Sequence, residues 1–356
     1  MEIGIVGLPN VGKSSLFNLL TSGHVASSNY PFTTIEPNVG MVSVPDPRLT
    51  RLAELFSPEK LTPAAIKFVD IAGLVKGASQ GEGLGNKFLS HVREVDAIVH
   101  LVRLFHDENV VHTMGSVDPL RDVQVIETEL ILADLDSIDK QISKSQGTAR
   151  SGDRTSKEKL EKLEQIKKCL DDGKNARLCG LSEAELRPFF LLSAKPILYV
   201  GNIGDGPNPE AVKKLELWAK EQGAGWLTLS IKLETELLEM SDEDRKNFRT
   251  ELGLGETGLE RLVRESYRLL DQVTFFTAGP TEVRSWITPR NAGAVVAASK
   301  IHTDISEGFI RADIYSFKEV DQWGSEKALQ EKGLIRSEGK EYLVQDGDVC
   351  FFHFRD

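Results

Sequence analysis

Short apolar runs alternate with helix-like stretches over residues 1–115 of the chain. The runs Ile3–Val6, Ile66–Asp70 and Ala97–Val102 have the length and composition of buried strands, and Asn86–Arg93 has the spacing of a helix. Such alternation is typical of βαβ units arranged around a mainly parallel sheet. A later apolar run, Pro196–Val200, predicts a further strand, so an α/β fold is expected here.

Two helical periods occupy the segment between these strands. The first runs from Val123 to Ile142, and the second places apolar residues at steps of three and four: Leu160, Leu163, Ile166 and Leu170. A polar run, Ser145–Arg154, lies between the two periods and predicts a flexible linker. Two amphipathic helices joined in this way predict an antiparallel hairpin whose apolar stripe is the packing seam.

The remainder of the chain changes character near residue 273. Before this point, Thr235–Leu252 and Gly258–Leu270 have helical patterns. After it, short strands are predicted at Val273–Thr277, Phe309–Ile314 and Val349–Phe354. Strands and turns of this kind over about 80 residues are typical of a small α+β domain.

The charge distribution is uneven. The chain of 356 residues has a formal net charge of −11, which argues against a protein that coats nucleic acid, and DNA is not an expected partner. Lys140–Gly180 nevertheless holds eleven Lys or Arg against six Asp or Glu, a net charge of +5, so the rest carries −16. Such a basic projection is either a contact for a polyanion or a solvated hairpin of mixed charge.

Cysteine content and hydropathy bear on the compartment. Cys169, Cys179 and Cys350 lack the spacing of a metal site, and reduced free thiols are expected. No apolar run has the length of a membrane-spanning helix, and a strand at the N-terminus leaves no room for a signal peptide. We therefore expect a cytoplasmic protein with no membrane partner.

The most specific motif follows the first predicted strand. Residues Gly7–Ser14 are G-L-P-N-V-G-K-S, which fits the pattern G-x-x-x-x-G-K-[ST] between a strand and a helix. The amides of such a loop cradle phosphates at the positive end of the helix. Lys13 is expected to reach the β- and γ-phosphates, and Ser14 Oγ to ligate Mg²⁺. The alternative, a chance glycine turn, is disfavoured by the strand-to-helix context. The expected nucleotide contacts in this loop are Asn10, Val11, Gly12, Lys13, Ser14 and Ser15.

Three further residues fit the same chemistry. Asp70 and Gly73 form a D-x-x-G motif in which the carboxylate would hold Mg²⁺ and the glycine amide would approach the γ-phosphate. Thr34 has a hydroxyl that can complete the Mg²⁺ shell when a triphosphate is bound. A single Asp or Thr is usually a cap or turn residue, but the ordered set is typical of GTPases. The expected catalytic residues are Lys13, Thr34, Asp70 and Gly73, and the expected metal ligands are Ser14, Thr34 and Asp70.

Recognition of the base is expected after two later strands. Asn202, Ile203 and Asp205 supply N-x-x-D, whereas guanine-selective proteins carry N-K-x-D. The isoleucine therefore replaces the lysine of that motif. Ser230 and Lys232 follow another predicted strand and fit the last loop that contacts the base.

Two positions bear on hydrolysis. Leu74 stands where many GTPases carry a glutamine, and since a leucine cannot orient the attacking water, slow or assisted hydrolysis is expected. Asn10 has two interpretations: its side-chain oxygen ligates a monovalent cation such as K⁺, or it stabilises the loop by a hydrogen bond. The glycine-rich run Gly77–Asn86 is interpreted as a switch loop, with an ordinary surface loop as the alternative.

Together these motifs resemble the YchF or Obg-like ATPase family of P-loop NTPases. Beyond the phosphate loop, the resemblance rests on Asn29–Asn38, Asp70–Leu89, Thr274–Pro280, His302–Ala312 and Gln345–Val349, and it covers essentially the whole chain. It implies a Ras-like nucleotide domain with an inserted helical hairpin and a C-terminal TGS domain of ubiquitin-like shape. The expected boundaries are 1–118 and 191–272 for the nucleotide domain, 119–190 for the hairpin and 273–356 for the TGS domain.

The resemblance also implies slow NTP hydrolysis, association with the ribosome and a preference for ATP over GTP. The family carries N-x-x-E in the base-reading motif, whereas this chain has Asp205 at the position of the glutamate. Two alternatives stay open: a GTP-selective switch, and a nucleotide-sensing module with negligible hydrolysis, which Leu74 suggests. The expected partners are ATP or GTP and the large ribosomal subunit, contacted through RNA or protein by the basic hairpin and the TGS-like unit.

Overall fold

The chain folds into two compact units. The computed structural model describes residues 1–23, 38–72, 84–107, 109–112, 114–149, 154–204, 206, 208–241, 243, 244, 247 and 256–355. The first unit holds residues 1–23, 38–41 and the described part of 67–269, and the second holds 42–66 and 270–355. This division does not test the expected domain boundaries, which stay a prediction.

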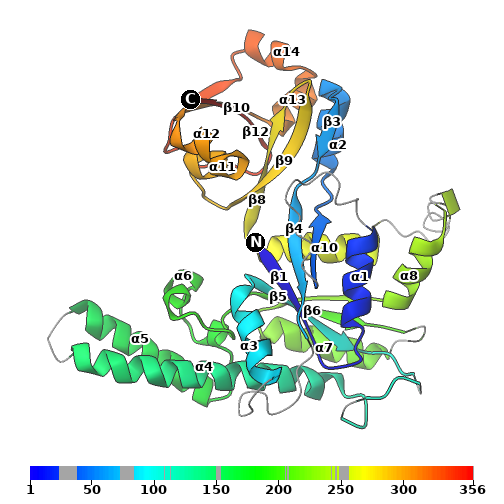
Figure 1. The fold of residues 1–356 in the computed structure, drawn as a ribbon, viewed down its shortest axis with the longest axis vertical. Coiled ribbons are helices and arrows are strands. Elements are labelled where there is room, and N and C mark those ends of the chain that lie inside the picture. The colour runs from blue at the N-terminus through cyan, green and yellow to red at the C-terminus, as the bar shows by residue number, and fades with distance from the viewer. Residues whose placement is uncertain are drawn as a thin grey trace. The chain divides into compact units, whose positions relative to one another are not determined.

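A largely parallel sheet is the centre of the first unit (Figure 1). Its strands are β1 (Glu2–Val6), β2 (Val39–Ser43), β4 (Ala65–Asp70), β5 (Ala97–Arg103), β6 (Ile197–Asn202) and β7 (Gly225–Leu229). They lie in the order β2-β4-β1-β5-β6-β7, and the pairs β4–β1, β1–β5, β5–β6 and β6–β7 are parallel. Parallel pairing brings the carboxyl ends of these strands to one edge, where α/β proteins bind ligands. The predicted strands of this sheet are confirmed.

Helices connect these strands. They are α1 (Lys13–Gly23), α3 (Leu84–Glu94), α7 (Pro209–Glu221), α8 (Ile231–Glu239) and α10 (Gly258–Leu269). The predicted helix Thr235–Leu252 begins too late, because Ser230 Oγ caps α8 by accepting a hydrogen bond from Leu233 N at 3.2 Å. The helix α8 ends at Glu239. Beyond it Glu243, Asp244 and Asn247 are helical, and the rest of the predicted stretch as far as Leu252 lies mostly outside the described residues, so that part stays a prediction.

The predicted helical hairpin is formed by α4 (Pro119–Ala149) and α5 (Arg154–Asp171), two long helices that lie side by side in Figure 1. Its seam buries Ile131 and Ile138 of α4 against Leu163, Ile166 and Leu170 of α5. The predicted linker is too long at both ends, since α4 continues to Ala149 and α5 begins at Arg154. The buried side chain of Ser145 shows that part of this polar run belongs to a helix that packs.

Short elements at the base of the hairpin pack against its seam. They are η2 (Ala176–Leu178), α6 (Glu183–Leu186) and η3 (Arg187–Phe189). Leu186 and Phe189 are buried in the same cluster as the seam residues. The carboxylate of Asp134 on α4 accepts hydrogen bonds from Leu192 N (2.8 Å) and from Ser193 N (2.8 Å) and Oγ (2.6 Å). The hairpin is therefore fixed to the chain that leads into β6.

The second unit is built on a mixed sheet in the order β11-β10-β12-β8-β9-β3. Its strands are β3 (Lys60–Thr62), β8 (Gln272–Ala278), β9 (Glu282–Pro289), β10 (Phe309–Ser316), β11 (Arg336–Glu338) and β12 (Asp348–Phe354). Its helices are α2 (Pro47–Phe56), α11 (Ala294–Ile301), α12 (Thr303–Glu307), α13 (Phe317–Trp323) and α14 (Glu326–Glu331). The three strands predicted after residue 273 are confirmed.

The segment 42–66 supplies a helix and a strand to this second unit. Leu49 and Leu52 of α2 are buried with Phe276 and Tyr315, and β3 pairs in parallel with β9. Arg48 ties the start of α2 to the far end of the sequence through a 2.7 Å ion pair with Asp346. The sequence pattern did not predict that residues 42–66 belong to the second unit.

Two expectations about composition also have a structural outcome. Cys169, Cys179 and Cys350 are free and buried, as expected. Within the described ranges, every helix is too short or too polar to cross a bilayer.

Candidate nucleotide-binding site

The glycine-rich loop connects β1 to α1 at the carboxyl edge of the parallel sheet. A side chain at Gly7 would place its Cβ 2.6 Å from Leu101 O, and Gly12 has a φ of +102° with Asn202 Nδ2 only 3.0 Å from where a Cβ would lie. Both positions therefore need glycine, for close approach at the first and for backbone conformation at the second. The loop lies directly on the ends of the strands.

Lys13 is the best-buried charged group of the loop, with a residue exposure of 8%. Its Nζ donates a hydrogen bond to Leu8 O at 2.8 Å, so the side chain folds back over the loop. Burial lowers the pKa of this ammonium group to about 8, and the negative charge of Asp70 partly opposes the shift. Among the described residues no carboxylate forms an ion pair with this ammonium group, and such a buried charge is suited to an anionic ligand.

Ser14 and Asp70 meet at the same edge. Ser14 Oγ donates a hydrogen bond to Asp70 Oδ2 at 2.9 Å, and the register of β1 with β4 pairs Ile5 with Asp70. The second carboxylate oxygen, Asp70 Oδ1, is buried and has no hydrogen-bond partner among the residues that the structure describes. A hydroxyl and an unsatisfied carboxylate oxygen are ligands that Mg²⁺ prefers, and the residues present fit this ion.

The described residues contain no group of three His, Cys, Asp or Glu side chains placed to hold a metal. A magnesium ion at Ser14 and Asp70 would therefore need further oxygen ligands, such as phosphates and water.

Asn202 joins the phosphate loop to the predicted base-reading segments. Its Nδ2 donates to Val11 O at 3.0 Å, and its Oδ1 accepts from Ile231 N at 3.2 Å. Ile203 N donates to Leu229 O at 2.9 Å, which fixes the segment after β6 beside the one after β7. A single buried amide therefore holds three loops together, as a base pocket next to a phosphate loop requires.

The loop after β5 is a neighbour of the phosphate loop that the sequence analysis missed. The buried guanidinium of Arg103 donates to Phe105 O, Asp107 O and Val110 O at 3.0–3.2 Å. Asn10 Nδ2 then donates to Val111 O at 3.1 Å. This contact favours the hydrogen-bond interpretation of Asn10. An arginine directly after an apolar strand was the available signal, because such a charge must find acceptors when it is buried.

A buried polar cluster lies under the sheet edge. His100 of β5 packs its ring 5.4 Å from that of Tyr199, whose hydroxyl donates to Glu127 at 2.5 Å and accepts from Arg177 at 3.0 Å. Burial, together with the positive charges of Lys13 and Arg177, lowers the pKa of His100 to about 3. His100 is therefore a neutral core residue.

The structure brings together part of the predicted site. Lys13, Ser14 and Asp70 form one cluster, and Asn202 reaches the loop at Val11. Ser15 and Lys232 are exposed on α1 and α8, and Ser230 is a helix cap. Thr34, Gly73, Leu74, Asp205 and most of Gly77–Asn86 lie outside the described residues, so their roles stay predictions.

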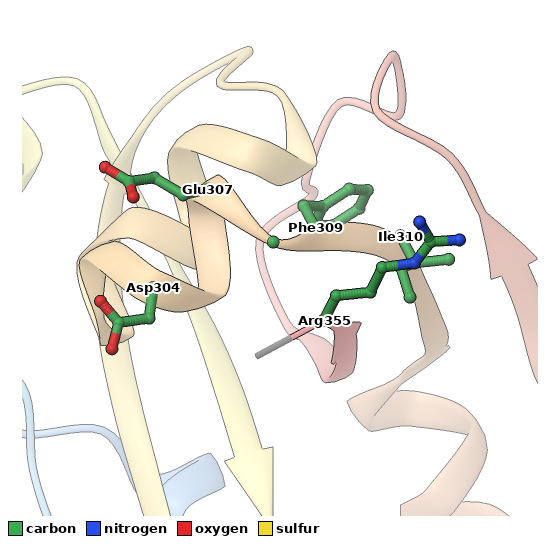
Figure 2. Close-up of a pocket in the computed structure, with 6 residues that line it drawn as sticks. Asp304, Glu307, Phe309, Ile310 and Arg355 are labelled. Carbon is green, nitrogen blue, oxygen red and sulfur yellow. The ribbon is translucent and has the colours of Figure 1, made fainter.

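The second unit contains a separate pocket of about 660 Å³ (Figure 2). It is lined by Asp304, Glu307, Gly308, Phe309, Ile310 and Arg355. A Cβ at Gly308 would lie 2.1 Å from Arg355 O, so glycine allows the end of β12 to approach this turn. Its charged lining side chains are two carboxylates and one guanidinium.

Comparison with known families assigns both parts of the chain. The model described as "50S ribosome-binding GTPase" matches residues 2–146, and YchF-GTPase_C, described as "Protein of unknown function (DUF933)", matches residues 272–355. A Haemophilus influenzae protein named ribosome-binding ATPase YchF is 47% identical over 359 residues, covering 99% of each chain. The Bacillus subtilis protein of the same name is 45% identical with the same coverage. The chain belongs to the YchF family.

Solved structures agree with this family. The Schizosaccharomyces pombe YchF GTPase matches with a TM-score of 0.89 and 33% identity, covering 99% of this chain and 97% of that one. A GTP-binding protein of Pyrococcus horikoshii matches with a TM-score of 0.63 at 19% identity, which shows the fold alone. The predicted family and the fold class, a GTPase-type α/β domain followed by a C-terminal α+β domain, are confirmed.

Proposed function

We propose that this chain is a Mg²⁺-dependent nucleoside-triphosphate hydrolase that prefers ATP to GTP and acts as a slow, ribosome-associated switch in the cytoplasm. The observation that carries the proposal is the cluster of Lys13, Ser14 and Asp70 at the carboxyl edge of the parallel sheet. The buried ammonium needs an anion and Asp70 Oδ1 needs a partner, and a magnesium triphosphate supplies both. Relatives named ribosome-binding ATPases support the activity and the partner.

Each residue of the cluster has a separate task. Lys13 would exchange Leu8 O for phosphate oxygens, and the loop amides would orient the γ-phosphate for in-line attack by water. Ser14 Oγ and Asp70 would hold Mg²⁺, which neutralises charge on the phosphate oxygens when it is bound. Thr34 and Gly73 are proposed to close the site from the segments outside the described residues.

The choice of base is proposed to depend on Asp205 and Ile203. A carboxylate at position 205 can accept hydrogen bonds from guanine, whereas Ile203 removes the lysine that packs over the base in guanine-selective proteins. Asn202 binds Val11 O and Ile231 N, so its side chain is occupied in shaping the pocket. ATP is therefore expected to be selected by backbone groups near Ile203.

Competitive binding of ATP and GTP tests this choice. Purified protein with Mg²⁺ is titrated with a fluorescent ATP analogue and competed with either nucleotide, wild type beside Asp205→Glu. We expect ATP to bind more tightly in both proteins. Tighter GTP binding in the wild type that Asp205→Glu reverses would instead support the GTP-selective switch.

K⁺ is proposed as an optional further ion beside Asn10 in the nucleotide site.

The ribosome contact is proposed to use the basic hairpin and the second unit. Exposed lysines on α5 favour the hairpin, because phosphate contacts supply most sequence-independent affinity for RNA. A nucleotide-sensing module with negligible hydrolysis is the second candidate, and Leu74 is the feature that favours it. Multiple turnover with ribosomes would exclude the sensor.

A further inference from the structure

Phe190 is an outlier among the described residues. It is 83% exposed, and its backbone is left-handed, with φ of 55° and ψ of 44°. The other described residues that combine a positive φ with a side chain are small or polar: Asn10, Asn38, Ser57, Asp271 and Asn291. A bulky side chain rarely adopts this conformation, and such strain persists only where the surroundings impose it.

The neighbours of Phe190 impose its position. Phe189 is buried in the hairpin cluster, and its carbonyl oxygen accepts from Gln141 Nε2 at 3.2 Å. Leu191 is buried in the same cluster, and the amide of Leu192 donates to Asp134. With the chain fixed on both sides, the ring of Phe190 is held in solvent on a rigid support.

Basic residues occur on the elements next to Phe190, together with Glu183 and Glu185 of α6. Arg187 lies one 3-10 turn before Phe190, whose amide donates to Arg187 O at 3.3 Å. On α4, Lys144 lies three residues after Gln141 and therefore on the face that contacts Phe189. On α5, Lys159 lies three residues before Lys162, which pairs with Glu185 of α6.

These three cations are available for a ligand. The side chains of Arg187, Lys144 and Lys159 are exposed and, in the part of the chain that the structure describes, form no ion pair. α6, which precedes Arg187, lies beside the hairpin in Figure 1. An exposed aromatic ring, with an exposed arginine on its own element and exposed lysines on the two adjacent helices, matches a nucleotide with a free base.

We propose that Phe190 is a stacking platform for an unpaired base of ribosomal RNA, with Arg187, Lys144 and Lys159 contacting the adjacent phosphates. The inference rests on the proposed ribosome contact of the hairpin and specifies the RNA groups that this contact would bind. RNA loops present unstacked bases that stack on aromatic and arginine side chains. The polar side chain of Gln141, which bonds the neighbouring Phe189 O, favours RNA over an apolar protein pocket.

Salt dependence separates the ring from the cations. Stacking releases no counterions, whereas each phosphate contact contributes to the slope of log K against log salt. We expect Phe190→Ala to weaken binding to purified ribosomes and to deproteinised ribosomal RNA roughly tenfold at every salt concentration, with the slope unchanged. Phe190→Tyr should retain binding, and Lys144→Ala with Lys159→Ala should reduce the slope.

Leu217→Ala is the control, because this apolar side chain is 55% exposed on α7, outside both the hairpin and the second unit. The control should bind as the wild type. Unchanged binding of Phe190→Ala, with weakened binding of the lysine variant, would overturn the platform and leave the hairpin contact standing. If Phe190→Ala weakened binding to ribosomes but not to deproteinised ribosomal RNA, the partner of Phe190 would be a ribosomal protein and not RNA. No effect of either variant would remove the hairpin contact itself.

Discussion

The protonation of Lys13 is expected to be coupled to nucleotide binding. Its ammonium group is held by one carbonyl oxygen, Leu8 O, and burial lowers its pKa to about 8. Phosphates would favour the protonated form, so nucleotide binding should take up a proton wherever the free site has lost one.

We expect the affinity for Mg²⁺-ATP to fall as pH rises above 8. At pH 9 about a tenth of the free sites would carry the protonated lysine, so binding should be roughly tenfold weaker than at pH 7. Isothermal titration across pH 6.5–9.5, in buffers of different ionisation enthalpy, measures both the affinity and the proton uptake.

Lys13→Arg is the control, because a guanidinium stays protonated throughout this range. Its affinity for the nucleotide should show no fall between pH 8 and 9. A wild-type affinity that is constant to pH 9.5, without proton uptake, would contradict the lowered pKa of Lys13.

The same shift affects stability in the opposite direction. Between pH 8 and the ordinary lysine value near 10.5, the unfolded chain binds more protons at this site than the folded chain. The contribution of Lys13 to folding stability therefore rises with pH over this window. Deprotonation of Lys13 in this pH range therefore does not unfold the protein, so it cannot weaken nucleotide binding by that route.

At the scale of elements, the hairpin is anchored by buried polar groups as well as by its apolar seam. Asp134 accepts three hydrogen bonds from Leu192 and Ser193, and Glu127 pairs with Arg177 at 3.0 Å. These anchors connect α4 to the base of the hairpin and to the chain that enters β6. The hairpin is consequently a rigid arm of the nucleotide unit.

Asp134→Ala should destabilise the protein by about 3 kcal/mol, because it leaves two buried amides and a hydroxyl without an acceptor. Urea unfolding measured by circular dichroism gives this difference in the free energy of unfolding. Asp136→Ala, two residues along the same helix in an exposed pair with Lys140, should change stability by less than about 0.5 kcal/mol. Equal effects of the two substitutions would show that the Asp134 anchor is unimportant.

The site residues that belong to short continuous motifs could be predicted from the sequence. The phosphate loop and the strand ending at Asp70 follow from spacing alone. Arg103 could not be assigned a role, since its acceptors are carbonyl oxygens of a loop without a motif. The polar run at Ser145 resembled a linker because composition does not reveal which face of a helix packs.

At the scale of the whole molecule, the chain is not divided in simple sequence order. Residues 42–66 belong to the second unit, where α2 is buried against Phe276 and Tyr315 and β3 extends the sheet. Periodicity predicts that a helix has an apolar face, but it does not say which core receives that face. This is why the sequence analysis did not assign residues 42–66 to the second unit, although it predicted the strands after residue 273.

Leu52→Ala should loosen the second unit, because Leu52 is fully buried among its residues. A loss of about 3 kcal/mol is expected for truncating such a side chain. Hydrogen exchange should accelerate in β10 and β12, while amides of β1 and β5 keep their protection. Leu20→Ala, a fully buried leucine of α1, should give the converse pattern. Acceleration confined to β1 and β5 in Leu52→Ala would contradict the assignment of α2.

The central claim, that the Lys13, Ser14 and Asp70 cluster performs Mg²⁺-dependent NTP hydrolysis, is tested most directly by multiple-turnover ATP hydrolysis. Wild type and Lys13→Ala are compared with and without purified ribosomes, and circular dichroism checks that the variant is folded. We predict slow, Mg²⁺-dependent turnover in the wild type, faster turnover with ribosomes, and none above background in folded Lys13→Ala. Wild-type turnover in folded Lys13→Ala would contradict the assignment of the site.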